Sequence, residues 1–187
     1  MHLDRSPAPG PLYPERHVSL EEYLALPEDG FQYDMIAGVL YVVPSHSSDH
    51  AFSEGKASLR FGYYLESNPV GRLYLELDVY LDDGDDDIVR PDFCVILNER
   101  VSEIVRGRHI HGPPDIVVEL LSDRTERRDR GIKADRYLRS GVREFWLIDP
   151  RDRSVEVRYN VDGVWESVSG DVLTSRVLPG LEIESAG

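Results

Sequence analysis

Two short apolar runs on either side of a basic helix constrain the fold of this chain more than any other feature. Residues 115–121 read DIVVELL and residues 145–148 read FWLI, and runs of this length are typical of buried strands. Residues 127–140 between them carry a helical apolar face, followed by Gly141 as the expected C-terminal residue of the helix. A strand, a helix and a strand in this order predict a β-α-β crossover, so we expect an α/β protein.

Further helices and hairpins are expected around this crossover. Each is marked by a change of apolar periodicity or by turn residues. The expected elements are a helix at 20–26 with a capping box of Ser19 and Glu22, a hairpin of 31–36 and 39–43 around Ala37-Gly38, a long helix at 47–68, a hairpin of 73–81 and 89–97 with an acidic tip at 82–87, and a peripheral hairpin of 155–159 and 164–168.

Length and composition bound the class of protein. The 187 residues suit a Pro-rich tail at residues 1–16 and one domain at residues 17–187. No apolar run approaches the roughly 20 residues that span a bilayer, and the first residues lack the apolar core of a signal peptide. The one cysteine, Cys94, excludes an internal disulfide and a cysteine-based zinc site. The expectation is a cytoplasmic protein without a membrane segment.

Two carboxylates interrupt apolar strands. Asp92 follows Arg90-Pro91 and precedes the apolar residues 93–96, and Glu119 lies inside the run at 116–121. A buried carboxylate is costly unless it is paired or binds a cation. On neighbouring strands the two would form an oxygen-rich site for a hard ion such as Mg²⁺. The alternative is that each is a strand-end residue paired with one of the many arginines.

Three residues of the basic helix could add to such a site. Asp129, Lys133 and Tyr137 are spaced four apart, which places them along one side of the helix. A lysine near a metal and a scissile phosphate can position the attacking water and offset developing charge. The alternative is an exposed Asp-Lys pair on a solvated helix face.

Together these segments resemble the Uma-two family of restriction-endonuclease-like proteins. The resemblance runs from Leu20 to Leu181 and is carried by RPD at 90–92, GPPDIVVELLS at 112–122, the three helix residues, GVREFWLIDP at 141–150 and His50. It implies a PD-(D/E)XK fold, in which helices flank a mixed central sheet with peripheral hairpins, and Asp92 and Glu119 as the metal-binding pair. Leu121 stands at the usual lysine position of the motif, and the resemblance gives that role to Lys133. Asp34 stands where relatives commonly carry a glutamate.

The resulting hypothesis is a Mg²⁺-dependent endonuclease acting on nucleic acid, with DNA as the expected substrate and Mn²⁺ as a possible substitute. Asp92 and Glu119 would ligate the ion and Lys133 would assist the attacking water. The second-rank candidates are Asp34, His50, Asp129 and Tyr137. The alternatives are a non-catalytic binding or assembly module and a different metallohydrolase on the same scaffold. A homo-oligomer is left open.

Charge distribution bears on this hypothesis. The net charge is −14, whereas a protein that grips phosphates usually presents a basic surface. Eight basic residues nevertheless gather beside the candidate site, where they could form a local basic patch on an acidic body. They are Arg124, Arg127, Arg128, Arg130, Lys133, Arg136, Arg139 and Arg143.

Overall fold

The computed structural model describes residues 16–185 except 28, 46 and 82–86. The expected tail therefore lies outside the described residues, apart from Arg16, and so does most of the acidic tip.

The crossover predicted from the two apolar runs is confirmed, and it forms the centre of a six-stranded mixed sheet. Strand β10 (Ile116–Leu120) pairs in parallel with β11 (Glu144–Ile148), while the other neighbours in this sheet are antiparallel. The sheet order is β13-β12-β11-β10-β7-β4, with β4 at Gly71–Leu75, β7 at Phe93–Leu97, β12 at Val155–Val161 and β13 at Val164–Ser169.

The hairpin predicted at residues 155–168 is found at the edge of the main sheet. Its first strand, β12, pairs with β11 over the whole length of β11 and so extends this sheet. Val155, Val157 and Tyr159 alternate inward and are buried, as a strand with one covered face requires.

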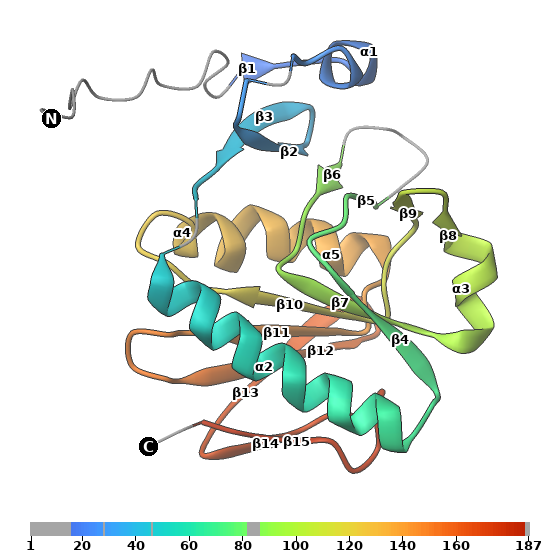
Figure 1. Cartoon of the computed structure of the whole chain (residues 1–187), viewed down its shortest axis with the longest axis vertical. Helices are drawn as coiled ribbons and strands as arrows, with labels where there is room; N and C mark the ends of the chain where they lie inside the picture. Colours follow the sequence, from blue (N-terminus) through green and yellow to red (C-terminus); the bar gives the residue numbers. More distant parts are fainter. Residues whose placement is uncertain (1–15, 28, 46, 82–86, 186–187) are drawn as a thin grey trace, which may run out of the picture.

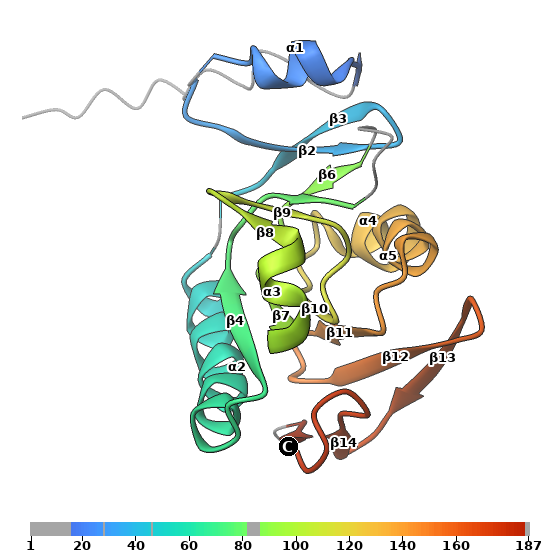
Figure 2. The ribbon, with the colours of Figure 1, turned by 90° about the vertical axis from the view of Figure 1, so that its right-hand side faces the viewer.

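Helices cover both faces of the main sheet (Figure 2). On one face lies α2 (Ser48–Ser67), whose Phe61 packs edge-on against Phe93 and Trp146 with ring centroids 5.3 and 5.8 Å away. On the other face lies a continuous helix built of α4 (Glu126–Arg128), a π-helical turn (Asp129–Lys133) and α5 (Ala134–Ser140). Gly141 ends it in the left-handed region at φ 98°, as predicted.

A second, seven-stranded sheet adjoins the main one (Figure 1). Its N-terminal part is the predicted hairpin, whose turn at Ala37 and Gly38 has φ values of 53° and 69°, the signature of a type I′ turn. The capping box that begins the first helix is also confirmed. The elements are β1 (Arg16–His17), α1 (Leu20–Leu24), β2 (Gln32–Ile36), β3 (Val39–Val43), β5 (Val79–Tyr80), β6 (Ile88–Val89), β8 (Val105–Arg106) and β9 (His109–His111).

The hairpin predicted at residues 73–97 exists, but each arm is broken into two strands. Strands β4 and β7 pair in the main sheet, and β5 and β6 pair in the second sheet. The breaks fall at Glu76, with φ 47°, and at Pro91, which has no N–H for a sheet ladder. Asp92 directly follows the second break, so it lies where the two sheets meet.

Several elements were not predicted, among them the two-residue strands β1 and β8 of the second sheet. Helix α3 (Asn98–Ile104) follows β7, and strands β14 (Val172–Thr174) and β15 (Glu182–Glu184) pair near the C-terminus. Among the described residues, no helix is both long enough and apolar enough to cross a membrane.

Candidate functional site

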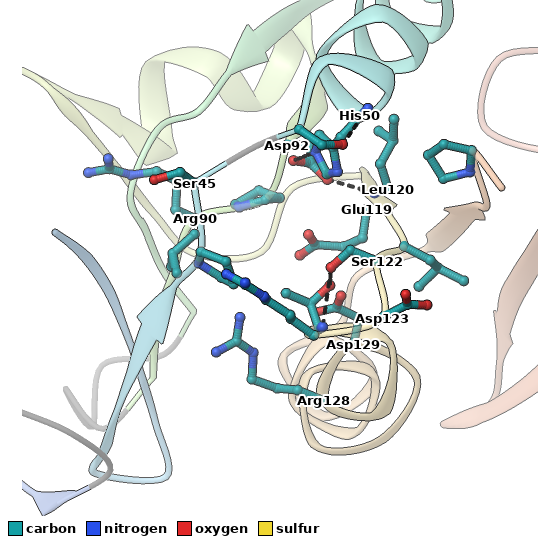
Figure 3. A pocket seen from close by; sticks show the side chains of 18 of the residues that line it. Ser45, His50, Arg90, Asp92, Glu119, Leu120, Ser122, Asp123, Arg128 and Asp129 are labelled. Atoms are coloured by element: carbon teal, nitrogen blue, oxygen red, sulfur yellow. Dashed lines mark hydrogen bonds and ion pairs between the residues drawn. The ribbon is translucent and has the colours of Figure 1, made fainter. Parts of the chain in front are cut away.

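A pocket of about 450 Å³ opens where the two sheets meet the helix that follows β10 (Figure 3). Six of the seven candidate residues line it, and the seventh, Tyr137, reaches it through a hydrogen bond to Glu119. The six are Asp34, His50, Asp92, Glu119, Asp129 and Lys133. The fold thus brings candidate residues that are distant in sequence into one place, while their roles in a site stay a prediction.

Asp92 is held at the strand end by two donors. Its Oδ2 accepts the Leu120 N–H at 2.6 Å, and its Oδ1 lies 3.0 Å from Nε2 of His50, which comes from the first turn of α2. Glu54, one turn further along α2, completes a group in which one ligand atom each from His50, Glu54 and Asp92 lies within 4.8 Å of the others. Two members of this group, His50 and Glu54, come from α2, and the third, Asp92, lies between β6 and β7.

Glu119 approaches the same pocket from the neighbouring strand. Val118 pairs with Phe93 in antiparallel register, so the next step of the register brings Glu119 beside Asp92. Its Oε1 lies 2.6 Å from the Lys133 ammonium and accepts the Tyr137 hydroxyl at 2.7 Å. Among the described residues, no hydrogen bond to its second oxygen, Oε2, is found.

Asp34 enters the pocket from the second sheet and is fully buried. Its Oδ1 accepts the Arg90 N–H at 2.9 Å. Its Oδ2 has no hydrogen-bond partner among the described residues, although the Lys133 and Arg128 side chains lie 3.5 and 3.8 Å from it. Asp34 therefore also presents a buried carboxylate oxygen without a donor.

The π-helical turn carries the two remaining charged groups. Asp129 and Lys133 are both buried, and their side chains lie 3.8 Å apart. The alternative of an exposed Asp-Lys pair is therefore wrong, because Lys133 is only 2% exposed and is surrounded by Asp34, Glu119 and Asp129.

Burial and crowding shift the protonation of this site. Burial raises the pKa of Glu119 to about 8, where the charges of Asp129 and Asp92 add to the effect and Lys133 opposes it. Burial also raises the pKa of Glu54 to about 7, together with the charges of Asp92 and Glu76. Acids that hold protons near neutral pH mark a place where negative charge is uncompensated.

The bases shift upward as well. Burial by itself lowers the pKa of Lys133, but Asp34, Glu119 and Asp129 outweigh it and raise that pKa above its usual value. Burial likewise lowers the pKa of His50, but the hydrogen bond to Asp92 and the charge of Asp92 raise that pKa above its usual value. Lys133 is consequently a permanent cation at neutral pH.

A buried carboxylate one strand away shows what a structural acid looks like in this protein. Glu144 of β11 accepts hydrogen bonds from the Trp146 indole, the Ser175 hydroxyl and the backbone N–H groups of Arg176 and Val177. These donors fix the C-terminal segment and satisfy both oxygens. Glu119 differs because one of its oxygens has no such donor, so burial in a strand alone does not distinguish the two.

The pocket offers donors for a divalent cation. Among the described residues, the His, Asp and Glu side chains whose ligand atoms lie close enough to share one ion are His50, Glu54 and Asp92, within 4.8 Å of one another. Asp34 and Glu119 line the same pocket as Asp92, on the side of Lys133. Carboxylate oxygens are the ligands that Mg²⁺ and Mn²⁺ prefer, while the imidazole of His50 would suit Mn²⁺ better than Mg²⁺. That one ion bridges Asp92 and Glu119 stays a prediction.

Sequence reasoning missed Glu54, which lies beside His50 and Asp92, and the contacts that hold Arg128 of the basic patch against β3. Glu54 lies four residues after His50 on the same side of α2, a spacing that could have indicated it. Arg128 donates to the Val42 carbonyl at 3.1 Å and lies over the Tyr41 ring; no sequence pattern links it to β3.

The expected basic patch is largely neutralised. Five of its eight members are in ion pairs with carboxylates, which leaves Arg124, Arg127 and Arg139 without an ion pair inside the described ranges. The five are Arg128 with Asp34, Arg130 with Glu126 and Glu156, Lys133 with Glu119, Arg136 with Asp87, and Arg143 with Asp115. The patch is therefore mostly an internal network rather than a free phosphate-binding surface.

Comparisons with known proteins agree with this fold. The model of the Uma2 family, described as "Putative restriction endonuclease", matches residues 20–186. A crystal structure from Anabaena variabilis, described as "a putative nuclease belonging to DUF820", superposes with a TM-score of 0.74 at 20% identity, covering 90% of this chain and 95% of that one. At this identity the likeness establishes the fold. No curated protein matches the chain.

Proposed function

From the premise that the chain belongs to the Uma2 family of restriction-endonuclease-like proteins, we propose that it is a metal-dependent endonuclease that hydrolyses phosphodiester bonds in DNA. The nuclease-like fold is shared with the Anabaena protein. The observation that carries the proposal is the pocket that Asp34, Asp92 and Glu119 line together. In it Asp34 Oδ2 is buried without a hydrogen-bond partner among the described residues, and Asp92 lies within 4.8 Å of ligand atoms of His50 and Glu54.

Asp92 and Glu119 would hold the ion, with Asp34, His50 and Glu54 as further donors around it. A bound Mg²⁺ or Mn²⁺ supplies a water of lowered pKa and neutralises charge on a phosphate oxygen. Without an ion, Asp92 is kept in place by the Leu120 N–H and by the imidazole of His50, which holds the carboxylate against α2.

Lys133 would act as a fixed cation. Because its pKa is raised by three carboxylates, it does not accept a proton at neutral pH. Its ammonium can instead donate hydrogen bonds to the attacking water or to a phosphate oxygen and offset charge that develops during displacement. Tyr137 orients Glu119 through its hydroxyl. The carboxylate of Asp129, four residues before Lys133 on the same side of the helix, lies 3.8 Å from the ammonium.

The proposal is tested by cleavage and metal binding measured in parallel. Wild-type protein is incubated with single- and double-stranded DNA and RNA in Mg²⁺, Mn²⁺ or EDTA, and metal binding is followed by melting temperature. We expect metal-dependent cleavage of DNA that Asp92→Asn abolishes together with the metal-induced rise in melting temperature. We expect Lys133→Met to abolish cleavage while the metal still binds, because lysine is not a ligand.

Two results would contradict the proposal. An Asp92→Asn protein that keeps the full metal response would place any ion elsewhere. A wild type that binds the ion but leaves every nucleic acid intact would favour the alternative of a non-catalytic binding module.

A further inference from the structure

A second hollow of about 690 Å³ adjoins the metal pocket and shares Asp49, Pro150 and Arg151 with it. It lies between the N-terminal half of α2, the turn that joins β11 to β12, and β15 (Figure 1). We call it the α2 groove and define it by Phe52, Lys56, Arg60 and Arg153, which line it.

The side of α2 that faces away from the sheet is unusual for a soluble protein. Phe52, Leu59 and Tyr63 are 69%, 56% and 64% exposed, and their spacing places them on one helix face. The opposite face carries the buried residues Phe61 and Leu65 that pack on the sheet. Because the core packs against the opposite side of the helix, these exposed apolar side chains are not needed for folding. Exposed apolar patches of this kind mark interaction sites.

Cations lie among these apolar side chains. Lys56 and Arg60 of α2 and Arg153 of the turn are exposed, and none of the three forms an ion pair within the described part of the chain. Arg151 is instead saturated by Asp149, Asp123 and Glu126. The remaining carboxylates of the groove are Asp49 and Glu184. In a chain of net charge −14, three unpaired cations against two carboxylates make the groove locally positive.

The arrangement of ring and charge favours one occupant. The Lys56 ammonium lies 5.8 Å from the centre of the exposed Phe52 ring, so a stacking platform and a phosphate-binding cation adjoin. Aromatic rings interleaved with cations along a groove are how proteins bind single strands, because every base has a face on which to stack. A second copy of this chain fits less well, since lysine is depleted at protein interfaces and both copies would carry the same net charge.

We propose that the α2 groove binds an unpaired segment of a nucleic-acid strand, with Phe52 stacking on a base and Lys56 and Arg60 contacting phosphates. This rests on the proposed function, because the groove continues into the pocket that would hold the scissile phosphate. A base can stack on Phe52 only when it has left a duplex. The preferred substrate is accordingly a single strand, or a duplex with an unpaired tail, rather than a blunt duplex.

The stacking is tested by fluorescence anisotropy of a labelled oligothymidylate, in EDTA so that no cleavage occurs. We expect Phe52→Leu, which keeps an apolar side chain without a π face, to weaken binding at least about fivefold, the low end of base–aromatic stacking. Phe52→Trp should retain wild-type affinity. Equal affinity of the leucine and tryptophan variants would overturn the stacking role.

The phosphate contacts are tested by salt dependence. For a single strand, the slope of log K against log salt changes by about 0.7 for each phosphate contact, so Lys56→Gln/Arg60→Gln should reduce it by roughly 1.4. The matched control is Arg108→Gln/Arg139→Gln, which removes two exposed cations from β8–β9 and from the helix on the other face of the sheet. An equal change in both double variants would overturn the assignment. All four side chains are exposed, so melting temperatures should match the wild type.

Failure of this inference differs from failure of the proposed function. If wild type cleaves DNA and Asp92→Asn does not, while the groove variants bind the strand like wild type, only the groove assignment is overturned. If the groove variants lose strand binding but no metal supports cleavage, the strand site is supported and the catalytic proposal is overturned. A change of sedimentation mass in Phe52→Leu with unchanged strand affinity would identify the groove as a contact between copies, against the inference.

Discussion

At the scale of single residues, the contrast between two buried glutamates separates structure from chemistry. Glu119 and Glu144 lie in paired strands and look alike in sequence, each a carboxylate among apolar residues. Glu144 is satisfied by four donors, whereas Glu119 has an oxygen left over and a pKa that burial raises to about 8. The residue type does not decide function here; the donors that the fold brings to it do.

The raised pKa of Glu119 predicts how stability depends on pH in the absence of metal. The folded protein holds a proton on Glu119 up to about pH 8, which the unfolded chain releases near its ordinary value of about 4.3. Stability from this group is therefore fully present below the unfolded pKa and is lost as the pH rises through the folded pKa. One pKa unit corresponds to about 1.4 kcal/mol, so between these values wild type should lose on the order of 5 kcal/mol more than Glu119→Gln.

Urea unfolding in EDTA at several pH values checks this. Glutamine keeps an oxygen for Lys133 and Tyr137 but cannot ionise, so its curve should be flatter. Glu66→Gln, which replaces an exposed glutamate of α2, should follow wild type. A wild-type curve that rises between pH 5 and pH 8 relative to Glu119→Gln would contradict the raised pKa.

At the scale of elements, local patterns predicted what local physics controls. The capping box of Ser19, the turn at Ala37-Gly38, the apolar run at 116–121 and the end of a helix at Gly141 each depend on neighbours in sequence, and each is confirmed. Spacing and resemblance also named most of the candidate residues found in the pocket. Features that depend on contacts between distant parts of the chain were not predicted.

The missed features share a physical cause. The break that sends the arms of one hairpin into two sheets depends on pairing partners far away, with β2 meeting β6 at Met35 and Ile88. The neutralised basic stretch depends on carboxylates such as Asp34, Asp87 and Asp115 that reach it from other elements. The π-helical turn widens a helix that periodicity alone describes as regular. Tertiary contacts decide all three, and a local pattern does not contain them.

Two glycines test the element-scale description. A Cβ at Gly71 would lie 2.8 Å from the Ile96 carbonyl oxygen of the paired strand, whereas a Cβ at Gly131 in the π-helical turn would have no such neighbour within 4 Å. Gly71→Ala should therefore destabilise by roughly 1–3 kcal/mol, as overpacking does. Gly131→Ala should stabilise by about 0.5–1 kcal/mol, because alanine loses less freedom in a helix.

Urea unfolding measures both changes, and the metal response of Gly131→Ala should equal that of wild type because its side chain adds nothing to the pocket. A destabilised Gly131→Ala would mean that the wide turn requires the backbone freedom of glycine. The site would then depend on strain in the helix as well as on its side chains.

At the scale of the whole molecule, the pocket exists only where the two sheets are docked. Asp34 comes from the seven-stranded sheet and Glu119 from the six-stranded one, while Lys133 reaches both carboxylates from the helix. The cluster concentrates negative charge in a protein whose net charge is already −14. Such a site repels phosphate until a cation neutralises it.

This repulsion predicts that metal and strand bind cooperatively. At constant ionic strength, Mn²⁺ should tighten binding of a labelled oligothymidylate about tenfold, within the usual range of coupling between two ligands. Linkage requires the strand to tighten Mn²⁺ binding by the same factor, so anisotropy and calorimetry measure one quantity in two ways. In Asp92→Asn the coupling should vanish, because the ion no longer sits in the pocket, while binding of the strand in EDTA should stay within about twofold of wild type. Equal tightening in both proteins would show that Mn²⁺ acts by screening the whole acidic surface. The pocket carboxylates would then have no special part in admitting a phosphate.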